Sequence, residues 1–216
     1  MKKYSQEEID IILKRHLNWL NEGCEGWEYM QADLSYTDLR GINFRSANLC
    51  YANLSYTDLR GVDISDTVLR NADLRMSNLS NADLRDSNLS EACLIQANLS
   101  GANLSEVVMR DTSLWGANLS NTDLSYANLI GADLGDTDFS NANLWNAGLR
   151  YANLGDACFR YADLSNTNFS SANLCNADLR NTIIEGTFFN NANLMHANLS
   201  YLDFSSATLS NANIRH

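Results

Sequence analysis

The sequence predicts an all-β protein whose chain winds in coils around a common axis and fills the interior with side chains. Three observations support this fold class. A large apolar residue returns every five positions from Leu34 to Ile214 without a slip, which makes 37 consecutive units. A small residue usually stands two places before each of these centres, and Asp or Asn stands directly before most of them. A spacing of five fits neither the 3.6-residue period of a helix nor the two-residue period of a strand, so each unit must turn the chain.

The residue types within the unit suit a filled coil. The centre is Leu in 27 units, and the place two before it is Ala in 22 and Thr in nine. If each unit turns the chain by the same angle, both places point inward and build two packed columns, one wide and one narrow. Asp or Asn precedes the centre in 28 units, where a short side chain bonds nearby backbone and favours a turn. The remaining two places are polar, small or aromatic.

The unit A-(D/N)-L-x-x resembles the repeat of the pentapeptide-repeat family over residues 32–214. The resemblance implies a right-handed quadrilateral β-solenoid with four units in each coil. The stretch LSYTDLRG agrees, because it occurs at Leu34–Gly41 and again, four units later, at Leu54–Gly61. The units then make about nine coils, and a strand spacing of about 4.8 Å gives a rod roughly 44 Å long. We expect a single structural domain, with the solenoid over residues 32–216 and a capping helix with a degenerate first repeat over residues 1–31.

An N-terminal cap is expected because a solenoid leaves its terminal core open. Ser5 and Glu8 form a capping-box pattern, and Gly23 suits the helix end. The apolar stripe of this helix consists of Ile9, Ile12, Leu13, Leu17 and Leu20. A cap over the first coil is favoured over a membrane-bound or partner-bound helix. Trp27 and Tyr29 fall at inward places of the repeat frame, so they indicate a first unit whose aromatic rings plug the core.

Composition bounds the functions that the chain can perform. Lys and Arg number 15 and Asp and Glu 26, a net charge of −11, which opposes binding to nucleic acid or to an anionic membrane. The five cysteines form no C-x-x-C pair and indicate reduced thiols rather than a disulfide framework. The first ten residues turn acidic after two lysines and contain no long apolar run. We therefore expect a cytoplasmic protein with no membrane span and no direct nucleic-acid contact.

The negative charge concentrates on one side of the predicted rod. Outward residues fall into four faces, and the face with centres Phe44, Ile64 and their successors at every fourth unit is here named the acidic face. It has nine acids against two arginines, a net charge of −7, whereas the other faces carry −3, 0 and +1. The nine acids are Asp63, Asp66, Asp83, Asp86, Glu106, Asp123, Asp163, Glu185 and Asp203.

Two interpretations of the acidic face stay open: a solvated surface kept for solubility, or a binding surface for a protein partner. Some pentapeptide-repeat proteins resemble duplex DNA in width and charge and occupy the DNA site of type II topoisomerases such as gyrase. The resemblance makes protection or inhibition of gyrase an alternative function here. The small net charge of the acidic face weighs against close mimicry of DNA, because about 44 Å of duplex carries on the order of 26 phosphate charges. The repeat also lacks the interrupting loops that such relatives often carry.

Self-association is expected at the carboxyl end of the repeats. Ile183 and Phe188 stand where Asp or Asn is usual, so they should point outward. With Ile214 of the last unit, they form the candidate interface of a homodimer. The alternative is that Ile183 and Phe188 only cover the edges of a corner.

Outer apolar residues also recur one coil apart along another face. They are Tyr36, Tyr56, Met76, Ile95 and Trp115. They form either a protein-binding stripe or a ladder that stabilises the solenoid without a partner.

No motif indicates a catalytic, cofactor or metal site. A filled rod without insertions offers no cleft in which polar groups could converge. His196 and His216 are four units apart, with Met195 and Cys175 nearby, but this set lacks the spacing of a structural zinc site. We expect a non-enzymatic protein that presents a rigid surface to a macromolecular partner.

Overall fold

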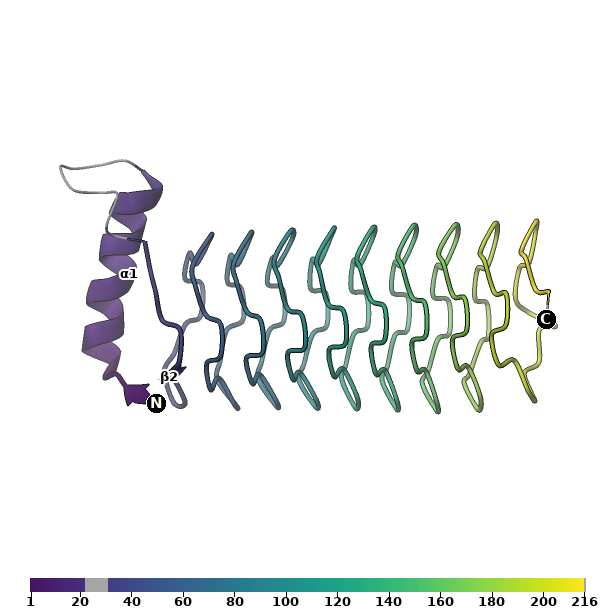
Figure 1. Cartoon of the computed structure of the whole chain (residues 1–216), viewed down its shortest axis with the longest axis horizontal. Coiled ribbons are helices and arrows are strands. Elements are labelled where there is room, and N and C mark those ends of the chain that lie inside the picture. Colours follow the sequence, from purple (N-terminus) through teal and green to yellow (C-terminus); the bar gives the residue numbers. More distant parts are fainter. Residues whose placement is uncertain (22–30, 216) are drawn as a thin grey trace.

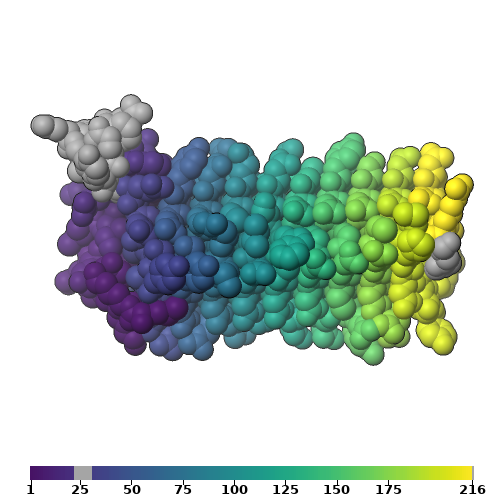
Figure 2. Space-filling model, viewed as in Figure 1, coloured from purple at the N-terminus to yellow at the C-terminus, as the bar shows by residue number. Residues whose placement is uncertain are grey.

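The computed structural model describes residues 1–21 and 31–215. The chain begins with a short strand, β1 (Lys2–Lys3), and continues into a helix, α1 (Gln6–Leu20). A second short strand, β2 (Thr37–Asp38), comes next. Figure 1 shows α1 at one end of a stack of coils that continues to the C-terminus. Figure 2 shows the same coils packed into a continuous rod. The chain thus folds as the β-solenoid that its repeat predicts.

Successive coils pair in parallel, each residue with the one four units further along the chain. Asp33 pairs with Asn53 at one end and Asn193 with Asn213 at the other, and every isolated bridge between them follows the same register. Four five-residue units therefore complete one coil, as the resemblance to the pentapeptide-repeat family implies. Each of these bridges is one residue long, because the chain bends at every unit and leaves no run of extended backbone.

A unit with Asp or Asn before its centre can satisfy all five of its backbone N–H groups, which explains how so short a repeat forms a stable coil. The centre and the last residue donate to the next coil, the residue before the centre donates to the preceding coil, and the first residue closes the corner. The fifth N–H finds the side chain of the Asp or Asn two places earlier. In the unit 52–56, these bonds are Ala52 N to Leu49 O (3.0 Å), Asn53 N to Ala32 O (2.9 Å), Leu54 N to Asp73 O (2.7 Å), Ser55 N to Asn53 Oδ1 (3.1 Å) and Tyr56 N to Arg75 O (2.9 Å).

The centres and the small residues fill the interior. All centres from Leu34 to Leu194 are buried. Phe139 and Phe159 stack in neighbouring coils with ring centroids 4.8 Å apart, so aromatic centres occupy the same column as leucine. Threonine fits the narrow column because its hydroxyl is hydrogen-bonded, as where Thr167 Oγ1 donates to Leu144 O at 2.7 Å.

The last residue of the unit forms the corner and adopts a left-handed conformation. Asn71 has φ 57° and Gly61 has φ 66°. Asn, Asp and Gly tolerate this region better than other residues. Their frequency at this place follows from the backbone geometry.

α1 packs against the first coil. Ser5 Oγ accepts the Glu8 N–H at 3.3 Å and Glu8 Oε2 accepts the Ser5 N–H at 2.8 Å, which is the capping box that the sequence predicts. Ile9 is fully buried, and Ile12 and Leu13 pack against the core. The helix ends at Leu20, which is half-buried.

The predicted stripe of α1 is wrong at one place, because Leu17 is 43% exposed and His16 is buried instead. At about 100° per residue, His16 lies within about 20° of Ile9 around the helix axis, whereas Leu17 lies roughly 80° away. The contact with a narrow coil end admits only the closer side chain. Gly23, Trp27 and Tyr29 lie outside the described residues, so their predicted roles remain predictions.

β1 extends the edge of the first coil. It pairs with β2 in parallel, with Lys2 opposite Thr37 and Lys3 opposite Asp38. The Lys3 ammonium lies 3.2 Å from the Asp38 carboxylate. The sequence does not predict this strand, because two residues carry no periodic signal.

Candidate binding face

The nine carboxylates of the acidic face lie in three rows along the rod. In one row, Asp63 and Asp83 occupy directly paired positions of neighbouring coils, where like charges are destabilising. The rows are Asp63, Asp83, Asp123, Asp163 and Asp203 before the centres, Asp66, Asp86 and Glu106 at the corners, and Glu185 after a centre.

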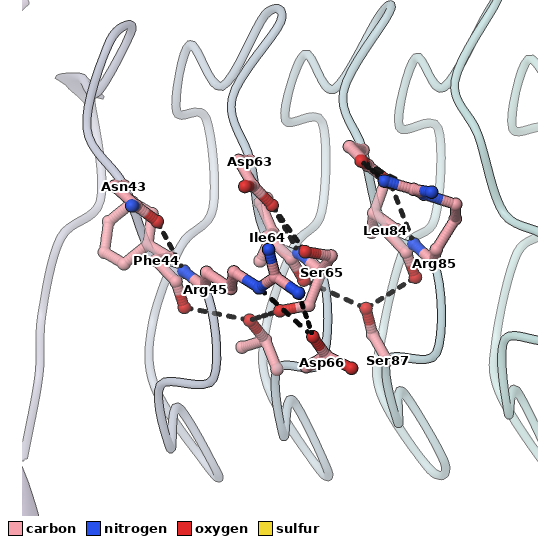
Figure 3. Close-up of polar contacts among 12 residues, drawn as sticks. Asn43, Phe44, Arg45, Asp63, Ile64, Ser65, Asp66, Leu84, Arg85 and Ser87 are labelled. Carbon is pink, nitrogen blue, oxygen red and sulfur yellow. Dashed lines mark hydrogen bonds and ion pairs between the residues drawn. The ribbon is translucent and has the colours of Figure 1, made fainter.

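The row before the centres has a structural role that does not require charge. Asp63 Oδ1 accepts the Ser65 N–H at 3.0 Å and the Ser65 hydroxyl at 2.6 Å (Figure 3). One coil away, Asn43 Oδ1 accepts the Arg45 N–H at 2.8 Å in the same way. A neutral carboxamide thus serves the backbone as well as a carboxylate does. The fold alone does not explain why this face is negative.

Two arginines compensate part of the charge (Figure 3). The Arg85 guanidinium hydrogen-bonds Asp83, with Nη2 at 2.6 Å from Oδ2, and this contact lowers the pKa of Asp83 although burial opposes it. Arg45 reaches across one coil to Asp66 at 3.2 Å. Within the described chain, the other seven acids of the face form no ion pair. The pKa of Asp203 is also lowered, because the Ser205 N–H donates to its carboxylate at 2.9 Å.

The candidate dimer residues are all exposed, but they do not form one patch. Ile183 pairs with Asp163 on the acidic face, and Phe188 pairs with Asn168 on the next face around the same coil. Ile214 is a centre on a third face. Ile183 and Phe188 thus lie on adjacent faces of one coil, and Ile214 lies on a third face.

Aspartate–arginine pairs are a second charged feature, and they were not predicted from the sequence. The Arg60 guanidinium folds back onto Asp58, with Nη2 at 2.6 Å from Oδ2, and lowers the pKa of Asp58. Arg40 contacts Asp58 from the preceding coil at 3.3 Å. These pairs neutralise the face centred on Leu39. The signal that could have revealed them is the tripeptide D-L-R, at 38–40, 58–60, 73–75, 83–85 and 178–180.

The described part of the chain contains neither a candidate metal centre nor a helix that could span a membrane. Its His, Cys, Asp and Glu residues form no group of three or more that could hold a metal ion. His216 lies outside the described residues, so its position relative to His196 is not placed. The helix α1 is too short and too polar to cross a bilayer.

The coils and faces define a class of protein, the repeat-built β-solenoid with polar residues arranged on flat outer faces. A family model described as pentapeptide repeats, in eight copies, matches residues 30–66, 63–101, 102–141, 127–166, 137–174 and 172–211. The chain belongs to the pentapeptide-repeat family. Among curated protein sequences, none matches it.

Solved structures of similar fold include other pentapeptide-repeat proteins. HetL, involved in heterocyst differentiation regulation in the cyanobacterium Nostoc sp. strain PCC 7120, is 29% identical over 97% of this chain and 92% of its own, with a TM-score of 0.42. A trypsin-treated form of QnrB1, a plasmid-mediated fluoroquinolone resistance protein, is 20% identical over 85% of this chain and 89% of its own, with a TM-score of 0.55. The likeness to QnrB1 supports the solenoid fold.

Proposed function

We propose that this chain is a non-enzymatic binding protein that presents a rigid, partly acidic solenoid surface to a protein partner in the cytoplasm. The proposal takes the molecule as a right-handed solenoid of about nine coils, with α1 as its N-terminal cap. One observation carries it: one face has a charge of −7, although asparagine before a centre serves the backbone as well as aspartate does.

A partner with lysine and arginine side chains would be favoured energetically. Like charges at paired positions cost stability, and a basic surface placed against them relieves that cost. A field of one sign also speeds association with an oppositely charged partner. The hydrogen-bonded coils are already ordered, so binding loses little conformational entropy on this side.

The test compares two sets of substitutions in cross-linking capture from the native cytoplasm. The first set, Asp66→Asn, Asp86→Asn and Glu106→Gln, neutralises unpaired and paired acids at corners of the acidic face. The matched control, Asp33→Asn, Asp111→Asn and Glu91→Gln, removes the same charge from other faces. A protein captured by the wild type and the control, and lost with the first set, supports the proposal. Equal capture by both sets contradicts it.

We also propose a homodimer through the C-terminal coils. Ile183 and Phe188 are exposed on adjacent faces of one coil, at places where most units carry Asp or Asn. Ile183→Asn with Phe188→Asn restores the common residue type and should convert a dimer into a monomer. Light scattering measures the mass, and a wild-type mass equal to one chain contradicts the dimer.

A second candidate function is binding to DNA gyrase in place of DNA, with protection or inhibition of the enzyme. The acidic face favours it, as does the fold shared with the fluoroquinolone resistance protein QnrB1. The experiment is competition between this protein and DNA for purified gyrase. Failure to displace DNA at micromolar concentration excludes this candidate and leaves the broader proposal in place.

A further inference from the structure

An apolar stripe runs along the face two units around the coil from the acidic face. This aromatic stripe consists of Tyr36, Tyr56, Met76, Ile95 and Trp115, one from each of five successive coils. The Tyr36 and Tyr56 rings stack with centroids 4.7 Å apart and planes 6° apart. All but the half-buried Ile95 are between 38% and 60% exposed. Single exposed apolar residues are ordinary, but an aligned series marks an interaction surface.

Trp115 carries the stripe into a sixth coil. A Cβ added to Gly135 would lie 3.0 Å from Trp115 Cδ1 and 3.5 Å from Nε1, so the missing side chain leaves room for the indole ring. Gly135 is buried although it occupies an outward place. The indole lies over the glycine and is still 43% exposed, which leaves part of the ring free for a partner.

The aromatic stripe leads directly into a group of carboxylates. Asp133 and Asp136 lie in the same unit as Gly135, Asp156 follows one coil on, and Asp138 lies just around the corner. In the part of the chain that the structure describes, none of these four carboxylates takes part in an ion pair. The same face carries no Lys or Arg between Arg75 and Arg215, and Arg75 is held by Asp73 at 2.5 Å.

We propose that the aromatic stripe and these four carboxylates bind an extended polypeptide segment in which a run of apolar residues adjoins lysine or arginine. This inference rests on the proposed function, which is binding to a protein partner. It places that binding on a different face and specifies the chemistry of the bound segment. Charge complementarity selects the basic part. The apolar part gains from exposed aromatic anchors, and an arginine side chain also stacks on an indole face.

The dimensions suit a short segment. From the coil of Tyr36 to that of Asp156 is six coil spacings, roughly 29 Å at about 4.8 Å each. An extended chain covers that length with about nine residues at about 3.3 Å per residue. The segment lies along the rod axis and crosses the coils.

The test is selection of binders from a random peptide library, about twelve residues long, on the intact chain. Enriched peptides should carry aromatic or aliphatic residues at one end and Lys or Arg at the other. Their affinity should fall about tenfold or more with Trp115→Ala. With Asp136→Asn and Asp156→Asn, it should fall severalfold and depend less on salt. Gly135→Ala should also weaken binding because it displaces the indole without removing it. Gly148→Ala is the control, since its added Cβ has no neighbour nearer than 4.0 Å.

Each outcome decides the inference. Thermal melts show which variants fold, and if Trp115→Ala does not fold, the Gly135→Ala and double Asp→Asn variants still test the surface. Peptides that bind all these variants as tightly as the wild type, or that lack basic residues, overturn the inference. If peptides that bind these variants normally instead lose affinity for the acidic-face variants, the acidic face is the binding surface and the proposed function is retained. No enriched peptide at all also overturns the inference, and the capture experiment then decides the proposed function independently.

Discussion

At the scale of single residues, an Asp or Asn side chain before the centre supplies the last hydrogen-bond acceptor that its unit needs. Asn88 is typical: its Oδ1 accepts the Ser90 N–H at 3.0 Å and the Ser90 hydroxyl at 2.7 Å. Without such an acceptor, one N–H in five has no partner within the coil. The preference for Asp or Asn therefore arises from the hydrogen bond to the backbone N–H. The two residues differ mainly in the charge that they place on the surface.

This role predicts that Asn88→Ala lowers the free energy of unfolding by about 1 kcal/mol, because the Ser90 N–H loses its acceptor. Asn88→Asp keeps the acceptor, and its paired neighbours Val68 and Val108 are uncharged. The aspartate variant should therefore unfold at nearly the wild-type urea concentration. Equal losses in both variants would show that the hydrogen bond is not responsible.

Burial of the centres predicts a cost that depends on the coil. Leu144→Ala should cost about 2–5 kcal/mol, because the side chain is fully buried between two coils. Leu199→Ala should cost less, because this centre is only partly buried. Urea unfolding of the two variants measures the difference, and a larger loss at Leu199 would contradict the packing described.

At the scale of elements, α1 buries a titratable group against the first coil. His16 Nδ1 accepts the Ala32 N–H at 3.1 Å, and its ring stacks on Trp19 with centroids 5.5 Å apart. Its Nε2 has no hydrogen-bond partner among the described residues. Burial lowers the pKa of His16, and a weaker backbone interaction with Cys50 opposes this.

The lowered pKa predicts that acid loosens α1. Because the folded pKa lies below the unfolded value of about 6.5, the unfolded chain binds the extra proton first. Stability is then complete above about pH 6.5 and falls as the pH drops below it, by at most about 1.4 kcal/mol per pH unit. Urea midpoints between about pH 7.5 and 5 should slope for the wild type and flatten for His16→Gln. Parallel slopes would show that another group is responsible.

At the scale of the whole molecule, the faces exist because each coil contains four units of the repeat. Residues 76, 96 and 116 occupy corners of three successive coils on one face. Any change in length that is not a whole number of coils moves all later residues to another face. Such a change would therefore disrupt a surface that spans several coils, such as the aromatic stripe, even if the solenoid still folds.

Two deletions test this register in a background with native cysteines replaced by serine. Both keep the repeat frame and should fold: one removes residues 82–101, a full coil, and the other removes 97–101, a single unit. With Met76→Cys and Gly116→Cys, the full-coil deletion places the two thiols one coil apart, within disulfide range. The single-unit deletion turns them onto different faces. Oxidation should link the pair only in the full-coil deletion, and a link in both would contradict four units per coil.

Much of the fold follows from spacing alone. The period of five and the inward places could be predicted because a repeat that turns by a constant angle converts sequence position directly into direction in space. The number of four units per coil came from the resemblance to the pentapeptide-repeat family, with which the recurring LSYTDLRG stretch agrees. The capping box of α1 was equally predictable, since Ser5 and Glu8 are three residues apart and need no distant partner. The acidic face could be predicted once four units were assigned to each coil.

Contacts between distant residues could not be predicted in this way. The exposure of Leu17, the burial of His16 and the pairing of β1 with β2 depend on how a helix meets one particular coil. Trp115 over Gly135 and Arg40 beside Asp58 depend on which side chain bends toward the next coil. The sequence by itself determined the direction of each residue, because direction is a local property of a regular repeat. Only the tertiary structure decided which side chains meet, because meeting depends on packing between coils.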